Sequence, residues 1–242
     1  MSFEKDLEVT ASNYHTNILS GWENLYSIMR MELFKRFSMF FTGEKVLELG
    51  CGDGEMTSHI VEYFKDVTVV DGSKTMLEEC QVRLNQYQNI NYELSTFEDY
   101  NPEKNFDTII MSHILEHLDE PVDFLRQVKE WLNPNGRIII AVPNAGSLHR
   151  RVAVKMGLLK SCDALNEQDL LLGHRRVYYP ETLQEDCKLA GYKTAFLGGL
   201  MLKPLTNRQI EKDWSPEMIK GFIDLGDDLP ELSAEIYIIL ER

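Results

Sequence analysis

The sequence predicts an α/β fold in which a mostly parallel β-sheet is flanked by helices. Residues 45–54 run from an apolar segment containing Val46, Leu47 and Leu49 into a turn with three glycines, and a helix-forming stretch follows. Strand-like and helix-like segments then alternate as far as residue 141, which is typical of parallel strands joined by right-handed crossovers. At 242 residues, 43% of them hydrophobic, the chain can bury the full core of one such domain.

Apolar runs separated by turn-forming residues predict the individual elements. Ser73 is placed to cap the second helix of the core, and Gly191 to end the last major helix. The turn Asn133-Pro-Asn-Gly136 should lead into the fifth strand. The expected strands are 45–49, 67–71, 90–94, 106–111 and 137–141, with a final pair at 192–200 and 234–240; the expected helices are 55–64, 74–86, 120–132 and 180–191.

The remaining segments divide the chain into four parts. We expect an N-terminal helical leader (1–43), a ligand-binding core (44–144), a helical cap (145–179) and a segment that completes the sheet (180–242). A second insertion, 204–230, interrupts the last pair of strands.

Composition excludes several classes of function. A net charge of −14 opposes a large nucleic-acid interface, which needs a basic face. No apolar run approaches the roughly 20 residues of a membrane-spanning helix, and the first residues lack the pattern of a signal peptide. The four cysteines, Cys51, Cys80, Cys162 and Cys187, show no C-x-x-C spacing. Reduced thiols in the cytoplasm are therefore expected.

The glycine turn argues against a dinucleotide. Its glycines are spaced G-x-G-x-G, and Glu55 stands where a dinucleotide fingerprint has its third glycine. Asp53 and Glu55 would repel a pyrophosphate, but they suit a ligand with a positive group. Asp71, at the end of the next strand, can accept hydrogen bonds from two ribose hydroxyls.

This strand–turn–helix–strand–acid unit resembles the first motif of class I S-adenosylmethionine (SAM)-dependent methyltransferases. The resemblance covers residues 45–144 and implies a Rossmann-like, seven-stranded, mostly parallel sheet with an antiparallel C-terminal strand. It also implies SAM as cofactor and S-adenosylhomocysteine as product. In the family the turn after the third strand meets the adenine, so Phe97 could lie on the ring face and Thr96 or Glu98 near the amino group, although Ser95–Asp99 departs from the commoner Gly-Asp-Ala pattern. The cofactor contacts implied are Glu48, Gly50, Cys51, Gly52, Asp71, Gly72, Thr96, Phe97, Glu98 and Ser112.

The segment after the fourth strand, Ser112–Pro121, is similar to the Leu-Glu-His segment of small-molecule methyltransferases, including those of ubiquinone biosynthesis. His113, Glu116 and His117 lie at i, i+3 and i+4, on one face of a helical turn. Three interpretations stay open. His113, with His117 beside it, acts as a general base. Alternatively the three residues bind a divalent metal, resembling the Glu-x-x-Glu-His site of some metal-assisted methyltransferases, with His149 or His174 as a fourth ligand. In the third interpretation the segment is structural.

Two basic triplets lie in the segment expected to cap the acceptor: His149-Arg150-Arg151 and His174-Arg175-Arg176. Because arginine binds phosphate and carboxylate groups through paired donors, an anionic acceptor is one interpretation. The alternatives are a solvated helix face for the first triplet and structural salt bridges for the second. The candidate acceptor contacts are Tyr14, His149, His174, Arg175, Arg176 and Tyr178. In class I methyltransferases an N-terminal leader often closes over the acceptor, and this resemblance adds His15 and Tyr26.

The expected function is transfer of a methyl group from SAM to a small, phosphorylated or nucleotide-linked acceptor, at oxygen because a histidine base is available. Residues 229–237 resemble methyltransferases of bacterial surface-polysaccharide and natural-product clusters, which implies a similar pathway. The alternatives are N- or C-methylation, an NAD(P)-dependent oxidoreductase, and a SAM-binding protein without catalysis. The chain can be a monomer or a homodimer.

Overall fold

The computed structural model describes residues 7–13 and 23–242, and within them a sheet of seven strands in the order β3-β2-β1-β4-β5-β7-β6. β7 runs antiparallel to both neighbours, and the other strands run parallel to one another. The predicted fold class is thus confirmed. The strands are β1 (Lys45–Leu49), β2 (Asp66–Asp71), β3 (Ile90–Leu94), β4 (Phe106–Ser112), β5 (Leu132–Pro143), β6 (Lys193–Leu200) and β7 (Glu235–Glu241).

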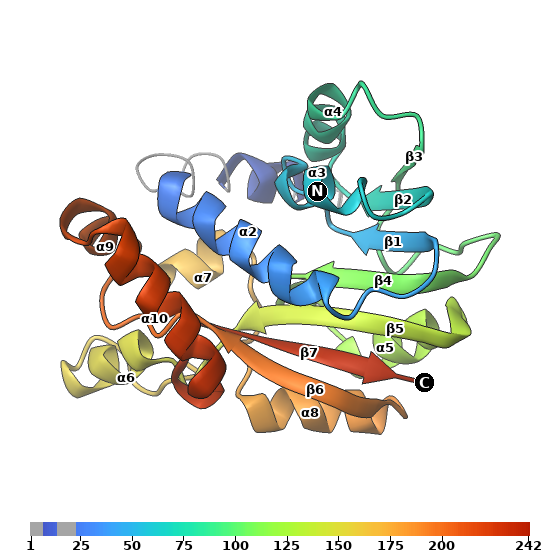
Figure 1. The fold of residues 1–242 in the computed structure, drawn as a ribbon. Coiled ribbons are helices and arrows are strands. Elements are labelled where there is room, and N and C mark those ends of the chain that lie inside the picture. Colours follow the sequence, from blue (N-terminus) through green and yellow to red (C-terminus); the bar gives the residue numbers. More distant parts are fainter. Residues whose placement is uncertain (1–6, 14–22) are drawn as a thin grey trace.

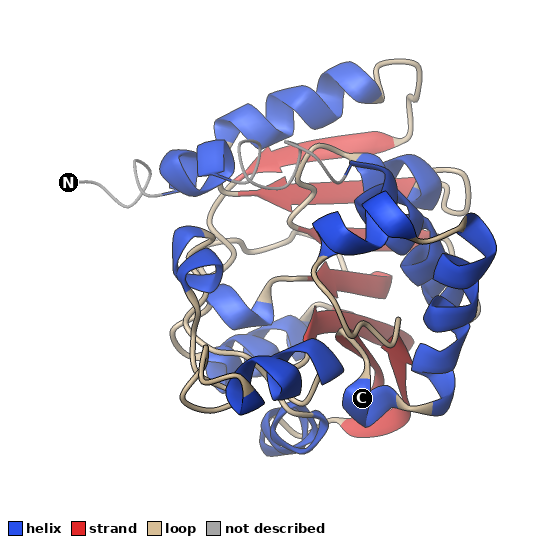
Figure 2. Cartoon of the chain, turned by 90° about the vertical axis from the view of Figure 1, so that its left-hand side faces the viewer, coloured by secondary structure: helices blue, strands red, loops and turns tan. Residues whose placement is uncertain are grey.

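Helices cover both faces of this sheet (Figures 1 and 2). α2, α3, α4, α9 and α10 contribute to the core on one face, and α5 and α8 to the core on the other. The helices are α2 (Glu23–Ser38), α3 (Glu55–Ile60), α4 (Lys74–Arg83), α5 (Pro121–Glu130), α6 (Leu148–Lys155), α7 (Glu167–Leu171), α8 (Pro180–Leu189), α9 (Asn207–Asp213) and α10 (Pro216–Asp228), with 3-10 turns η1 (Leu115–His117) and η2 (Pro230–Leu232) and a short helix over 7–13.

Alternation along the central strands explains the two cores. In β7, Tyr237 and Ile239 enter the first core, whereas Ile236, Ile238 and Leu240 enter the second. A strand buried on both sides is apolar at nearly every position, which is why these strands read as continuous hydrophobic runs.

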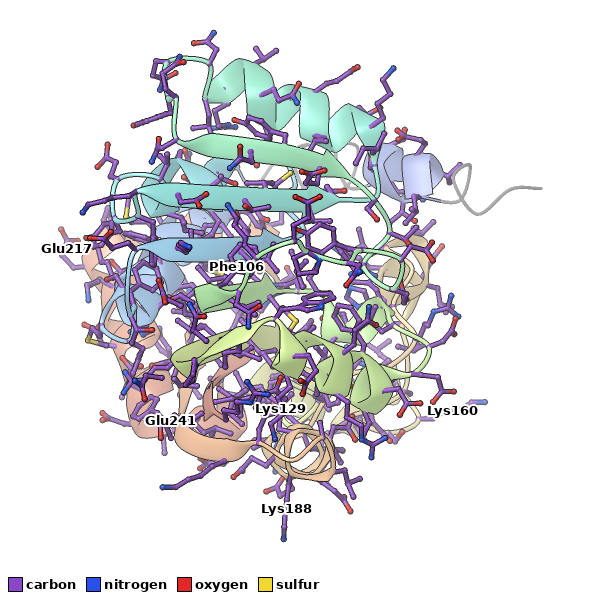
Figure 3. All side chains as sticks on the ribbon, turned by 90° about the vertical axis from the view of Figure 1, so that its right-hand side faces the viewer. Phe106, Lys129, Lys160, Lys188, Glu217 and Glu241 are labelled. Carbon is purple, nitrogen blue, oxygen red and sulfur yellow. The ribbon has the colours of Figure 1, made fainter. Side chains whose placement is uncertain are left out.

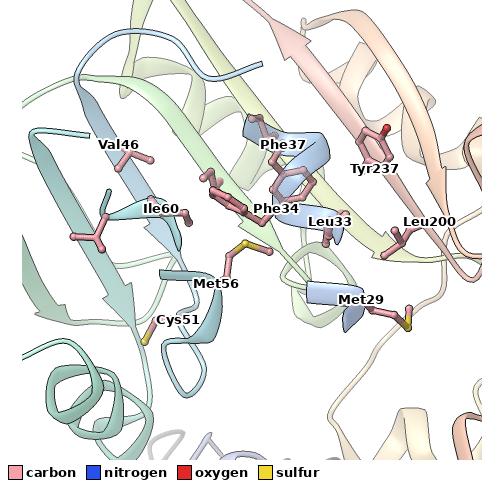
Figure 4. Packing of buried hydrophobic residues seen from close by; sticks show 14 of the residues in the cluster. Met29, Leu33, Phe34, Phe37, Val46, Cys51, Met56, Ile60, Leu200 and Tyr237 are labelled. Carbon is pink, nitrogen blue, oxygen red and sulfur yellow. The ribbon is translucent and has the colours of Figure 1, made fainter. Parts of the chain in front are cut away.

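α2 closes the first core with a narrow apolar stripe. Leu25, Met29, Leu33 and Phe37 follow one another at every fourth position and are buried, which is the spacing of one helix face. Figure 4 shows Met29, Leu33, Phe34 and Phe37 between the sheet residues Val46, Leu200 and Tyr237. The leader is therefore packed into the same core as the sheet.

Some element boundaries differ from the sequence prediction. β5 begins at Leu132, because the Asn133–Gly136 segment forms an irregularity inside the strand: its register with β4 moves from Phe106–Leu132 to Thr108–Arg137. Asn133 holds this segment by donating a 2.7 Å hydrogen bond to Asp107. α3 is shorter than expected, ending at Ile60. The cap segment 145–179 is helical only in α6 and α7.

Other details agree with the prediction, and the edges of the sheet are now defined. Ser73 caps α4 by accepting a hydrogen bond from the Met76 amide. The carboxyl ends of the parallel strands face the viewer in Figure 2. The opposite edge, where Phe106 begins β4 and Glu241 ends β7, faces the viewer in Figure 3. Within residues 7–13 and 23–242, no helix combines the length and the hydrophobicity needed to cross a membrane.

Two glycines of α10 give opposite stability predictions. A Cβ on Gly226 would lie 2.3 Å from the backbone nitrogen of Met201, because α10 packs directly on the end of β6, whereas a Cβ on Gly221 would meet no atom within 4 Å. We expect Gly226→Ala to lower the free energy of unfolding by about 1–3 kcal/mol through overpacking. Gly221→Ala should raise it by roughly 0.5–1 kcal/mol, because alanine favours the helix. Urea denaturation of both variants tests the pair, and equal effects would contradict the packing described here.

Candidate functional site

The carboxyl ends of β1, β2 and β4 define the candidate site. The chain order of the strands reverses between β1 and β4, and ligands of open α/β sheets bind outside the strand ends at such a point. The glycine turn follows β1, Asp71 ends β2, and Ser112 ends β4. These three segments come together as the sequence predicted.

The glycine turn requires glycine both for its backbone and for the close approach of neighbouring side chains. Gly50, Gly52 and Gly54 all have positive φ, at 76°, 51° and 84°, which glycine adopts without strain. A Cβ on Gly50 would lie 2.3 Å from Ile114 and 3.5 Å from Phe97. Phe97 therefore lies beside the turn, and its contact with an adenine stays a prediction.

Asp71 is fixed by two backbone amides. Its carboxylate accepts hydrogen bonds from Cys51 N at 3.0 Å and Ser73 N at 2.8 Å. Burial raises its pKa, although these bonds oppose the shift. The side chain is held at the mouth of the turn, where a hydroxyl-bearing ligand can reach it.

Glu48 is a buried carboxyl on β1 beside the turn. It is 2% exposed, and its Oε2 atom has no hydrogen-bond partner. Burial raises its pKa to about 8, and the nearby charge of Asp71 adds to this shift while a hydrogen bond from Thr57 opposes it. An incoming cation would favour the ionised form, so the pair of acids suits a ligand with an ammonium group and a ribose.

The short helix over 7–13 covers this end of the site. Glu8 accepts hydrogen bonds from Lys74 N and the Ser73 hydroxyl at the start of α4. A Cβ on Gly72 would lie 2.8 Å from Leu7. At the other end of the helix, Asn13 donates to the carbonyl of Leu171 in α7. The helix therefore bridges the start of α4 and the cap.

Three other expected cofactor contacts, Thr96, Glu98 and Ser112, form hydrogen bonds with residues outside the glycine turn. Thr96 donates a hydrogen bond to Asp99 at 2.7 Å, and the Glu98 carbonyl accepts one from Gln127. The Ser112 hydroxyl lies 3.3 Å from Arg30 and 3.2 Å from His113, which places it with the polar cluster described next.

His113 lies in a network with Arg30 and Glu235. Its φ of 60° is unusual for a residue with a side chain. The Nδ1 atom lies 3.1 Å from Arg30 Nη1, and Nε2 lies 3.6 Å from Glu235 Oε1. Because arginine can only donate, Nδ1 is the acceptor and Nε2 carries the proton. The lone pair that a general base would use therefore points at Arg30.

Lys203 and His149 extend this network, which we call the charge cluster: Arg30, His113, His149, Lys203 and Glu235. Burial opposes ionisation of Glu235, but Arg30, His113 and Lys203 outweigh it and lower its pKa to about 2. Burial lowers the pKa of Lys203 to about 8. Burial also lowers the pKa of His149, to about 2, and the charges of Lys203 and Arg150 add to this shift. His149 is thus neutral at physiological pH.

Sequence analysis did not find Arg30, Lys203 or Glu235. Arg30 and Glu235 are 205 positions apart and form a 2.7 Å ion pair. Glu235 begins β7, which also ends in a glutamate, Glu241, so the sequence did not set it apart.

Three further predicted residues gather at a second position. One ligand atom each from Glu116, His117 and His174 lies within 4.8 Å of the others. His113 is not part of this group, since its ring contacts Arg30 and Glu235. The expected metal set of His113, Glu116 and His117 is corrected accordingly, and His174 takes the place of His113.

Most arginines of the two basic triplets form hydrogen bonds or ion pairs within the protein. Arg175 donates to the His117 carbonyl and pairs with Asp119, and Arg176 donates to the Asp119 carbonyl. Arg150 is buried against Asp169, so a solvated helix face is wrong for the first triplet. The structural interpretation of the second triplet fits these contacts.

The predicted aromatic contacts also lie elsewhere. Tyr178 is 3% exposed and donates to Asp186, so as an acceptor contact it is corrected to a core residue. Tyr26 stacks on Arg30, with the guanidinium carbon 4.9 Å from the ring centroid. Tyr14 and His15 lie outside the described residues.

Comparison with known proteins identifies what the chain resembles. A family model described as a methyltransferase domain matches residues 22–195. The mitochondrial ubiquinone biosynthesis O-methyltransferase of Schizosaccharomyces pombe is 28% identical over 120 residues, 48% of this chain and 44% of that protein. A demethylmenaquinone methyltransferase of Tropheryma whipplei is 33% identical over 98 residues, 40% of this chain and 41% of that protein. The chain thus spans less than half the length of these curated relatives.

Solved structures share the fold. A SAM-dependent methyltransferase from Mesorhizobium loti superposes with a TM-score of 0.65 at 16% identity, over 90% of this chain and 100% of that chain. The N-methyltransferase NodS from Bradyrhizobium japonicum, in complex with S-adenosylhomocysteine, gives a TM-score of 0.61 at 13% identity, over 98% of this chain and 96% of that chain. The family expected from the sequence is confirmed.

Glu48 predicts a pH-dependent stability. Its folded pKa of about 8 exceeds the ordinary value of 4.5, so the folded state holds a proton that the unfolded state releases. Its contribution is fully present below about pH 4.5 and is lost as pH rises through about 8. We expect the free energy of unfolding of the wild type to fall across this window relative to that of Glu48→Gln. Chemical denaturation of both proteins across the window tests this, and parallel pH profiles would contradict it.

Proposed function

The chain belongs to the methyltransferase domain family, and from this premise we propose that it transfers the methyl group of SAM to a hydroxyl oxygen of a small anionic acceptor. The observation that carries the proposal is the charge cluster. It brings a histidine and two basic side chains to the end of β4, the strand next to β1, which the glycine turn follows.

The cofactor part of the proposal rests on the turn and its two acids. Asp71 offers a fixed carboxylate for ribose hydroxyls, and Glu48 offers a buried carboxyl for an ammonium group. NodS, which has a similar fold, was solved with S-adenosylhomocysteine. This supports the same cofactor here.

The chemistry needs alignment and a base. SAM supplies its methyl group from a sulfonium and leaves as S-adenosylhomocysteine, with the electron pair of the broken carbon–sulfur bond on sulfur. The protein must hold the acceptor oxygen in line with that bond, and a group must take the hydroxyl proton as the new carbon–oxygen bond forms.

His113 is the proposed base. Its Nδ1 lone pair is engaged by Arg30 in the structure. An anionic group on the acceptor competes for the donors of Arg30 and so frees this lone pair to take the hydroxyl proton. Glu235, 3.6 Å from Nε2, then stabilises the imidazolium that forms. His117 takes no part in this scheme.

The balance of charge in the cluster favours an anion. Arg30 pairs with Glu235, the charge of Lys203 also acts on Glu235 while its Nζ atom donates a hydrogen bond to Asn207, and His149 is neutral because its pKa is about 2. This basic excess lies in a chain of net charge −14. A phosphate or carboxylate on the acceptor would complete the pairing.

Relatives support oxygen as the methylated atom. Ubiquinone biosynthesis O-methyltransferases and malonyl-[acyl-carrier protein] O-methyltransferases are among the similar proteins. The surface-polysaccharide pathway, the cytoplasmic location and the four-part domain division stay predictions.

Lys203 predicts acceptor selectivity. In a screen of hydroxyl compounds as matched pairs, each acid against its neutral ester, we expect the release of S-adenosylhomocysteine to favour the acids. Lys203→Met should raise the acceptor KM about 10-fold or more, since a hydrogen bond to a charged group contributes about 1.5–3 kcal/mol. Lys155→Met, an exposed lysine of α6, serves as the matched control. Equal KM values for the two variants would contradict an anion at Lys203.

His113 predicts a loss of turnover without a loss of cofactor binding. Asparagine tolerates positive φ but cannot act as a base, so we expect His113→Asn to lower kcat by about 10²–10⁴-fold. Its affinity for S-adenosylhomocysteine, measured by calorimetry, should match that of the wild type. An unchanged kcat at saturating acceptor would exclude His113 as the base.

A further inference from the structure

We propose that Glu116, His117 and His174 form a binding site for a divalent transition-metal ion. Glu116 and His117 belong to η1, just after β4, and His174 follows α7 in the cap. The proposal concerns binding alone and stands apart from the proposed function.

Glu116 is the first reason. The residue is 0% exposed, and neither carboxylate oxygen has a hydrogen-bond donor among the described residues. A buried carboxylate is costly unless it is paired or coordinates a metal. The backbone at Glu116 is fixed, because its carbonyl accepts a 2.8 Å hydrogen bond from Arg175 N. The orphaned carboxylate is therefore held in place beside the two histidines.

The outer contacts of the histidines are the second reason. His174 Nδ1 lies 3.4 Å from Asp169 Oδ1, near enough for an ion pair but without a hydrogen bond, and the Gly173 backbone lies beside His117, where a Cβ would be 3.8 Å from Nδ1. Metal-binding histidines characteristically engage one ring nitrogen with a carboxylate or a carbonyl, which orients the other toward the ion. The Asp169 carboxylate is itself held by Arg150 at 3.0 Å.

The geometry fits one ion with open coordination positions. The three ligand atoms lie within 4.8 Å of one another, whereas the ligand atoms of a tetrahedral ion with bonds of about 2.1 Å lie roughly 3.4 Å apart, so the side chains would draw together as the ion binds. The rings of His117 and His174 meet edge to face, with centroids 4.8 Å apart. Two imidazoles and one carboxylate suit Zn²⁺ or Fe²⁺, whereas Mg²⁺ and Ca²⁺ prefer all-oxygen sets.

The ion would join the cap to the sheet. Its ligands come from the segment after β4 and from the loop after α7, and Asp169 lies within α7. Binding should therefore stabilise the folded protein as well as the site.

The test uses purified, chelator-treated protein. We expect calorimetry to show one Zn²⁺ per chain, Co²⁺ to give the visible absorption of a nitrogen- and oxygen-bound ion, and Mg²⁺ to bind far more weakly. Zn²⁺ at about 100 times its Kd should raise the Tm by roughly 5–10 °C. Absence of Zn²⁺ binding, or binding no stronger than that of Mg²⁺, would overturn the proposal.

Variants assign the site. Asp169→Asn should weaken Zn²⁺ binding about 10–100-fold, the usual loss when an outer partner is removed, and Glu116→Gln and His174→Asn should weaken it further. His59→Gln, in α3 away from these residues, should bind Zn²⁺ like the wild type. A metal-free variant whose Tm matches that of the metal-free wild type has kept its fold, so a loss of Zn²⁺ binding in it reports on the site. Two such folded variants are enough to assign the ligands. Wild-type affinity in the folded variants would overturn the proposal.

Discussion

A buried ion pair between α2 and the last strand holds one side of the candidate site together. Arg30 of α2 and Glu235 of β7 lie 2.7 Å apart, with side chains 8% and 11% exposed. Removing two charges from water is expensive, and an apolar pair is often as stable. What the pair adds here is position: it fixes α2 over the end of the sheet and holds the ring of His113 between its two members. The site therefore depends on both ends of the chain being folded together.

The sequence predicted the sheet well because its strands are buried on both faces. β1, β2 and β4 appear as mainly apolar runs that end at glycine or at a polar residue, and their limits differ little from the prediction. The irregularity in β5 could not be read in the same way. It arises from pairing across Asp107, a contact between segments that no local pattern records.

The candidate site shows the same difference between local and long-range signals. The glycine turn was recognisable because local backbone geometry requires its glycines. The charge cluster was not, because Arg30, Lys203 and Glu235 each look like an ordinary charged residue until the fold brings them together. The basic triplets show the opposite: they are dense in sequence, yet Arg150 pairs with Asp169 of the cap, and Arg175 pairs with Asp119 after η1. Charge density along a chain is therefore a poor guide to charge density at a site.

The helix over residues 7–13 has a consequence for how the core and the cap respond to change. It touches the start of α4 through Glu8 and the cap through Asn13, and Leu7 lies over Gly72 beside Asp71. One short helix thus links the segment after β2 to the end of α7. The core and the cap are therefore coupled through residues that belong to neither, and a change that loosens this helix acts on both.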